Sequence, residues 1–218
     1  MSTKKQIIIV SGLSGAGKTT FIKCVQTGGY PELAASLGMD KPAEWNVVLA
    51  KKMFNIQSLE EDKLILHLDI YKWFYVHRGL ERIYKAIENT EIKSVVSLWV
   101  EPDVLVRRSS RKLRRRAAKA FHSFVAGLFR RTKKYTTRNV RHKKRLRLLT
   151  HNWRQYHAYR DPGTVGTVYK AWFDWVIRAP TAKHVLLDST QNFSVITEEF
   201  CESEARQIVR GDFIRFQN

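Results

Sequence analysis

The chain contains little cysteine and no long apolar run. Cys24 and Cys201 are the only cysteines, and they are far apart in the sequence. This argues against a disulfide framework and favours a reducing, cytoplasmic compartment. No stretch reaches the about 18 consecutive apolar residues that a membrane-spanning helix requires. The apolar run at 6–10 is too short for a signal-peptide core, so we interpret it as a buried strand.

Acidic residues are missing from one long segment. From Val104 to Arg160 the chain has 20 Lys and Arg and no Asp or Glu, whereas the remaining residues hold 19 basic and 20 acidic side chains. The net charge of +19 therefore comes almost entirely from this part of the chain, which we call the basic segment. A charge asymmetry of this kind predicts an anionic partner.

A glycine-rich stretch near the beginning of the chain matches a phosphate-binding motif. "GLSGAGKT", from Gly12 to Thr19, fits G-x-x-x-x-G-K-[ST] at every fixed position and lies between a strand pattern and a helix pattern. Backbone N–H groups of such a loop surround phosphate oxygens, the lysine reaches the β and γ phosphates, and the threonine hydroxyl ligates Mg²⁺. We therefore expect ATP and Mg²⁺ to bind here. The predicted contacts are Gly12, Ser14, Gly15, Ala16, Gly17, Lys18, Thr19 and Thr20.

Two acidic residues follow apolar strand patterns and are candidates for a second Mg²⁺ contact. Asp69 ends "LILHLD" and Glu101 ends "LWVE". We favour Asp69, because a carboxylate at the C-terminal edge of a parallel sheet faces the same crevice as the loop. Asp69 has two alternative roles, as the N-cap of the next helix or as the acceptor of a substrate proton. Glu101 fits the start of the following helix better.

The order of the predicted elements indicates an α/β fold. We expect strands at 6–10, 46–50, 63–69, 94–100 and 184–190, the last of these being the final strand. Helical spacing is seen over 19–27, 73–87, 104–130, 140–156 and 164–178, and "RTKKYTTRN" is expected to separate the two long basic helices. This alternation predicts a doubly wound parallel sheet with helices on both faces. The core would comprise residues 1–103 and 181–218, and residues 104–180 would form a basic helical insertion.

Three stretches together resemble the small P-loop kinases, including the adenylylsulfate kinases and nucleoside monophosphate kinases. They are "IIIVSGLSGAGKTTF", "SVVSLWVEPDVLVRR" and "HVLLDSTQNFSVITEEF", and they occur in the family's order. The resemblance implies a P-loop NTPase core, arginines of a lid that close over the phosphates, and a turn beside the base after the last strand. By position, Arg107, Arg108 and Arg111 match the lid arginines, and Thr190, Gln191 and Asn192 match the turn.

The chain departs from this family in two places. The region between the last two predicted strands is longer and more basic than the short or moderate lid of a small-molecule kinase. In addition, "HLDIYKWFYVHRG" matches no substrate-binding pattern of these enzymes, although His77 and Arg78 are candidates for contacts with an anionic substrate. Surface positions on a helix are the alternative for both residues.

Three interpretations of the basic segment remain open. It could bind nucleic acid, with Tyr135, Trp153, Tyr156 and Tyr159 as candidates for stacking on bases. The aromatic spacing on the second long helix is more typical of core packing than of stacking. The basic segment could bind an anionic membrane surface or a glycolipid, which would give a peripheral membrane location. It could also be a solvated face of a helical lid.

The sequence as a whole favours an ATP-dependent phosphotransferase that acts on an anionic or macromolecule-linked acceptor. Lys18, Asp69 and the three lid arginines would carry the reaction. A nucleotide-dependent protein that binds nucleic acid or membrane without transferring phosphate is the alternative, and a sulfotransferase-like enzyme is a more distant one. The guanine-binding pattern N/T-K-x-D is missing, which argues against a GTPase.

Overall fold

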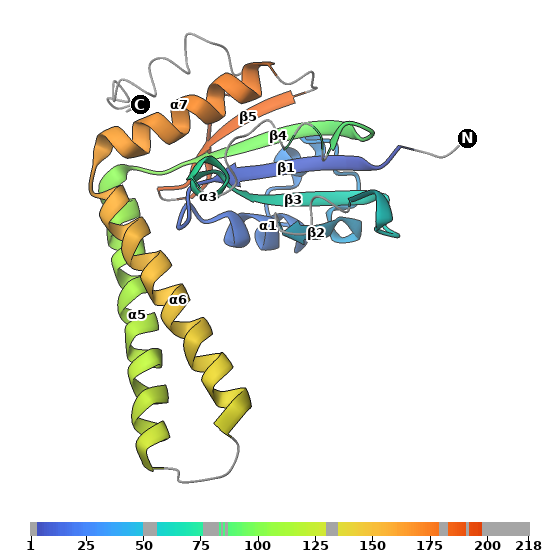
Figure 1. Ribbon diagram of the computed structural model, residues 1–218. Helices are drawn as coiled ribbons and strands as arrows, with labels where there is room; N and C mark the ends of the chain where they lie inside the picture. Colours follow the sequence, from blue (N-terminus) through green and yellow to red (C-terminus); the bar gives the residue numbers. More distant parts are fainter. Residues whose placement is uncertain are drawn as a thin grey trace. The chain divides into compact units, whose positions relative to one another are not determined.

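The computed structural model describes residues 4–49, 56–75, 83, 85, 87–129, 135–178, 183–190 and 192–197, with the backbone alone for 123–124, 126–129 and 135–145. A six-stranded, mostly parallel sheet has the order β2-β3-β1-β4-β5-β6, flanked by helices (Figure 1). The strands are β1 (Gln6–Gly12), β2 (Asn46–Leu49), β3 (Lys63–Asp69), β4 (Glu91–Trp99), β5 (Lys183–Asp188) and β6 (Ser194–Thr197). The helices are α1 (Lys18–Gln26), α2 (Pro31–Ser36), the short 3-10 helix η1 (Pro42–Glu44), α3 (Ile70–Tyr75), α5 (Pro102–Phe129), α6 (Tyr135–Tyr159) and α7 (Pro162–Arg178).

Strand β1 lies in the middle of the sheet, between β3 and β4, and is parallel to both. Residues 7–10 are four consecutive β-branched residues and all are buried, as expected for a strand that is covered on both faces. The last residue of β1, Gly12, is paired with Asp69 on one side and with Leu98 on the other. The segment that follows β1 therefore begins between the C-terminal ends of two neighbouring strands.

Helices cover both faces of this sheet. Ser94 Oγ donates a hydrogen bond to the carbonyl oxygen of Leu37, just after α2. Three residues along the same strand, Ser97 Oγ accepts a hydrogen bond from Trp172 Nε1 of α7. Side chains three residues apart in a strand point to opposite faces, so α2 and α7 lie on different sides of the sheet. Both serines are buried, and these hydrogen bonds satisfy polar groups that burial would otherwise leave unpaired.

The chain divides into two compact units. The first contains the sheet and comprises Met1–Val100 and Gly166–Asn218, and the second comprises Glu101–Val165. In the second unit, α5 and α6 lie side by side as a pair of long helices (Figure 1). The boundary falls inside α7, so the larger part of this helix belongs to the unit that holds the sheet. None of the helices that the structure describes is both long and apolar enough to cross a membrane.

The predicted α/β class and the five predicted strands are confirmed, and two details are wrong. The strand at 183–188 is not the final one, because β6 follows it and pairs with it antiparallel. Strand β6 has only four residues, of which the first two are exposed and the last two half-buried. Its sequence therefore shows no regular apolar pattern that would predict a strand. Second, α6 begins at Tyr135, inside the stretch expected to separate the long helices, because that stretch contains no Gly or Pro to end a helix. The middle of the helix predicted at 73–87 lies outside the described residues.

Candidate functional site

The loop from Leu13 to Gly17 connects the end of β1, Gly12, to α1. The backbone needs glycine at Gly12, just before the loop, and at Gly17, its last residue. Gly12 has φ 149° and Gly17 has φ 84°, a backbone region that residues with a Cβ rarely adopt. A Cβ on Gly12 would also come within 2.9 Å of the carbonyl oxygen of Leu98. The two glycines that the motif fixes are therefore required by this backbone. Together they let the chain turn sharply from β1 into α1, so that the loop lies at the helix N-terminus.

Lys18, the first residue of α1, directs its ammonium group back into the loop. Lys18 Nζ donates hydrogen bonds to the carbonyl oxygens of Gly12 and Leu13, at 2.8 and 2.7 Å. The side chain is only 4% exposed, so a positive charge is held inside the turn next to the N–H groups at the start of α1. An anion that entered the loop would meet the lysine charge and the helix N-terminus together.

Thr19 lies beside a histidine that the motif does not include. Thr19 Oγ1 is 3.3 Å from Nε2 of His67, which is the third-last residue of β3. Burial, followed by the nearby ammonium of Lys18, keeps the pKa of His67 below its ordinary value. The ring is therefore neutral at pH 7. Sequence reasoning missed His67, although the alternation in "LHLD" places it on the same face of the strand as Asp69.

Asp69 ends β3 next to the loop, where it is paired with Gly12. Its side chain is half-buried, and Oδ1 accepts a hydrogen bond from the backbone N–H of Lys72 at 3.3 Å. This contact caps α3, as one of the alternatives drawn from the sequence expects. Capping α3 does not prevent Asp69 from contacting a metal. Oδ1 accepts the hydrogen bond from Lys72, and the second carboxylate oxygen can ligate a metal or accept another hydrogen bond.

Tyr169 of α7 holds the first residue of the loop. Its buried hydroxyl donates a hydrogen bond to the carbonyl oxygen of Leu98 at 2.9 Å and accepts one from the backbone N–H of Leu13. Burial raises the pKa of Tyr169, so the hydroxyl stays protonated. The tyrosine thus links the loop to the end of β4. No local motif marks Tyr169, which lies more than 150 residues after the loop in the sequence.

The predicted base-side turn follows β5. Asp188 Oδ1 accepts a hydrogen bond from the N–H of Thr190 at 2.7 Å. The N–H and hydroxyl of Ser189 both donate to the carbonyl oxygen of Trp99, which ties the turn to β4. Gln191 lies outside the described residues.

The end of this turn reaches the start of α1 through Phe193. A Cβ on Gly17 would be 3.2 Å from the Phe193 ring, and the rings of Phe21 and Tyr30 are 5.4 and 6.3 Å from it between centroids. Tyr30 also donates a hydrogen bond from its hydroxyl to the carbonyl oxygen of Asn192. The structure therefore brings Asn192 to the same end of the sheet as the glycine-rich loop. Phe193 and Tyr30 were missed, because aromatic residues at these positions carry no motif.

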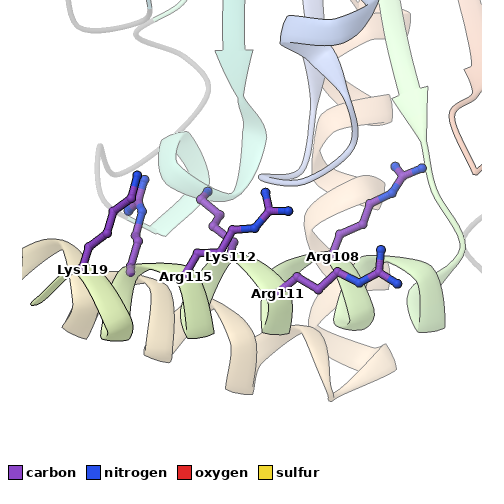
Figure 2. Close-up of a pocket in the computed structure, with 6 residues that line it drawn as sticks. Arg108, Arg111, Lys112, Arg115 and Lys119 are labelled. Carbon is purple, nitrogen blue, oxygen red and sulfur yellow. The ribbon is translucent and has the colours of Figure 1, made fainter. Parts of the chain in front are cut away.

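The three predicted lid arginines lie on α5, in the second unit. Arg107 and Arg111 are exposed and Arg108 is half-buried. Two of them, Arg108 and Arg111, line a groove with a volume of about 390 Å³ along α5 (Figure 2). Its lining residues, which define what we call the α5 groove, are Arg108, Arg111, Lys112, Arg115, Arg116 and Lys119. Arg107 does not line it. Of the other candidates, Glu101 is exposed just before α5, and His77 and Arg78 lie outside the described residues.

The aromatic residues proposed for stacking separate into different environments. Trp153 is 54% exposed, and its ring lies 4.2 Å from that of His157 between centroids. Tyr156 is half-buried, with the guanidinium of Arg160 5.9 Å from its ring. Tyr159 is buried, which fits the core packing that the aromatic spacing favours and excludes stacking of this ring on a base. For Tyr135 the structure gives the backbone only.

No protein-family model matches the chain, and the comparison with curated proteins found no match. Within the part of the chain that the structure describes, no three His, Cys, Asp or Glu side chains come together as a metal-binding group.

Proposed function

We propose that this chain is an ATP-dependent phosphotransferase whose sheet is a doubly wound core of the P-loop NTPase type. The observation that supports this most directly is the position of Lys18. Its buried ammonium is hydrogen-bonded to the carbonyl oxygens of a loop whose glycines adopt positive φ. The ammonium therefore lies inside the turn, beside the N–H groups at the start of α1. A positive charge and a helix N-terminus that converge on one loop are suited to bind phosphate oxygens.

In this proposal the loop binds the phosphates of ATP and neutralises charge as the phosphoryl group is transferred. Lys18 exchanges the carbonyl oxygens of Gly12 and Leu13 for phosphate oxygens, and the N–H groups at the start of α1 bind the remaining oxygens. Tyr169 keeps the N–H of Leu13 in place through its hydroxyl. Phosphoryl transfer needs positioning and charge neutralisation more than covalent chemistry, and these residues provide both.

The residues at the loop also fit Mg²⁺. Mg²⁺ prefers oxygen ligands and is usually held by one or two carboxylates, waters and the substrate phosphates. Thr19 offers a hydroxyl at the start of α1, and Asp69 offers a carboxylate at the strand end paired with Gly12. Bound Mg²⁺ would neutralise charge on the phosphate oxygens. Neutral His67, 3.3 Å from the Thr19 hydroxyl, would orient that hydroxyl.

The other roles follow from the resemblance to small P-loop kinases. Arg107, Arg108 and Arg111 would supply lid cations, and Thr190 and Asn192 would lie beside the adenine. The acceptor would be anionic or linked to an anionic macromolecule, since a small neutral acceptor does not require a segment with 20 basic residues and no acidic one.

The first test is ATP binding by the Lys18→Ala variant, with Lys23→Ala as the control. Lys23 is an exposed residue of the same helix, so its loss removes a charge without touching the loop. We expect Lys18→Ala to weaken binding of a fluorescent ATP analogue by about 100-fold, because it removes charge-assisted hydrogen bonds to phosphate. Unchanged affinity in Lys18→Ala would contradict ATP binding at this loop.

The second test is transfer itself. The chain is incubated with γ-labelled ATP, Mg²⁺ and separate sets of sugars, nucleosides, glycolipids and oligonucleotides. We expect label in one acceptor class, dependent on Mg²⁺ and lost in Lys18→Ala. ATP binding with no labelled acceptor and only slow hydrolysis would instead favour the alternative, a nucleotide-dependent binding protein. The cationic α5 groove in a separate unit is the observation that favours this alternative.

A further inference from the structure

We propose that the α5 groove binds the sugar-phosphate backbone of a nucleic acid. All six lining residues are Lys or Arg, and all come from one helix. They recur every three or four residues along the helix, with adjacent pairs at 111–112 and 115–116, so they form one stripe along α5. From Arg108 to Lys119 the helix rises by about 16 Å. The groove therefore has more cationic groups than a nucleoside triphosphate has phosphates.

The row of like charges lowers the stability of α5 when no ligand is bound. Arg108 and Lys112, and likewise Arg111 and Arg115, are like charges four residues apart, and such pairs destabilise a helix. The second unit contains 20 Lys and Arg but only three carboxylates, Glu101, Asp103 and Asp161.

Three carboxylates are few beside the cationic side chains of this unit. Asp161 accepts hydrogen bonds from the N–H groups of Gly163 and Thr164 and from the hydroxyl of Thr164, so it caps α7. Asp103 lies in the first turn of α5, before the groove begins. A polyanion from outside the chain would relieve the repulsion along the whole stripe.

A nucleic acid fits the groove better than a membrane surface does. A helix that lies on a membrane inserts an apolar face next to its cationic residues. On α5, the buried Ser109 and Ala120 and the half-buried Leu113 lie at the flank of the stripe, and α6 packs along α5. Phe121 is exposed on α5, but it does not line the groove. A concave, cationic stripe without apolar residues in its lining suits a chain of phosphates.

Exposed aromatic rings on α6 provide a second contact that proteins use to bind nucleic acids, the stacking of bases. Trp153 is 54% exposed and is held against the ring of His157. An exposed tryptophan can stack on an unpaired base, whatever the base. If the ligand is single-stranded, Trp153 fluorescence should therefore change on binding. A duplex, whose bases are already stacked, should bind the groove without this change.

The test measures binding of fluorescein-labelled oligonucleotides of about 20 nucleotides to the full chain, by anisotropy and without ATP. Wild type should bind with a micromolar Kd at about 0.1 M salt, as expected for sequence-independent binding. The groove variant is Arg115→Gln with Lys119→Gln, and the control is Arg107→Gln with Arg114→Gln. Both remove two charges from α5, and all four residues are exposed, but only the first pair lines the groove.

We expect the groove variant to bind about tenfold more weakly at physiological salt and to reduce the salt dependence of log K by about 1.5, corresponding to two lost phosphate contacts. The control should change affinity by about twofold or less. Circular dichroism should show the same helix content in both variants, since Gln is a good helix former. Equal losses in the two variants, or no binding by wild type, would overturn the proposal.

Binding to lipid vesicles distinguishes a nucleic acid from a membrane surface as the ligand of the α5 groove. Wild type is sedimented with vesicles of phosphatidylcholine alone and of phosphatidylcholine with phosphatidylserine. Preferential binding to oligonucleotides, reduced in the groove variant, supports the proposal. Binding to the anionic vesicles that exceeds oligonucleotide binding and depends on Arg115 and Lys119 would assign the groove to a membrane surface instead. Because ATP is absent, failure here leaves the proposed phosphotransferase unaffected, and Lys18→Ala should bind oligonucleotides like wild type.

Discussion

The imidazole Nε2 of His67 lies 3.3 Å from the hydroxyl of Thr19 and thereby connects β3 to the first turn of α1. The ring is partly buried, and both burial and the charge of Lys18 lower its pKa. The neutral ring can donate one hydrogen bond and accept another. The hydroxyl that would face Mg²⁺ thus has a partner that fixes its orientation.

The lowered pKa of His67 predicts that the protein loses stability as the pH falls. Below about pH 6.5 the unfolded chain binds a proton on this histidine before the folded chain does, so the free energy of unfolding decreases until the pH passes the folded pKa. The loss from His67 should be less than about 1 kcal/mol, because solvent screens a partly exposed ring. Urea unfolding at several pH values between about 5 and 7.5 measures it.

His67→Gln tests whether this residue causes the loss. The variant should show a smaller decrease in the free energy of unfolding over the same pH range. A residual decrease is expected, because burial also lowers the pKa of His184, and that contribution has the same sign. His184→Gln should remove the residual part. An unchanged pH dependence in His67→Gln would mean that the ring is not desolvated in the folded chain.

Asp69→Asn should separate the two roles of Asp69. Asparagine caps a helix about as well as aspartate, so α3 should keep its cap and the free energy of unfolding should change little. Mg²⁺-dependent phosphate transfer should fall by about 100-fold or more, because the amide carries no charge for the metal. Asp69→Ala should lose the cap as well, with a stability loss of about 1 kcal/mol. Full transfer activity in Asp69→Asn would exclude a direct role at the metal.

Tyr169→Phe should weaken both the fold and the loop. The variant leaves the carbonyl oxygen of Leu98 and the N–H of Leu13 without the buried hydroxyl that pairs them. A lost buried partner costs about 1–3 kcal/mol, which chemical denaturation can measure. ATP affinity should also fall, since the first N–H of the loop is no longer fixed. Tyr75→Phe is the control, because Tyr75 is exposed at the end of α3. A stability change equal to that of the control would show that the hydroxyl is not structural.

Neutralising part of the α5 groove should stabilise the helix slightly when no ligand is present. Arg115→Gln with Lys119→Gln removes like-charge contacts at spacings of three and four residues, each unfavourable by about 0.2–0.5 kcal/mol. Thermal unfolding at low salt should show a small increase in Tm. The increase should disappear at about 1 M salt, where surface charges are screened. A decrease in Tm at low salt would mean that these cations have stabilising partners.

The sequence by itself determined the elements whose physical signal is local. Four consecutive β-branched residues and the glycine pattern identified β1, the loop and the start of α1, because the backbone conformation at Gly12 and Gly17 excludes most other residues. The absence of acidic residues between Val104 and Arg160 likewise needed no structure. These local features were enough to predict a phosphate-binding loop and a cationic helical part of the chain.

Only the tertiary structure decided which distant residues meet at the loop. His67, Tyr169 and Phe193 come from β3, α7 and the turn before β6, and none of them belongs to a motif. Their positions depend on strand order and on the packing of α7 against β4, which are non-local contacts that local propensity does not encode. The same applies to the α5 groove. The sequence gives the charges, but helical geometry selects the six residues that form one stripe.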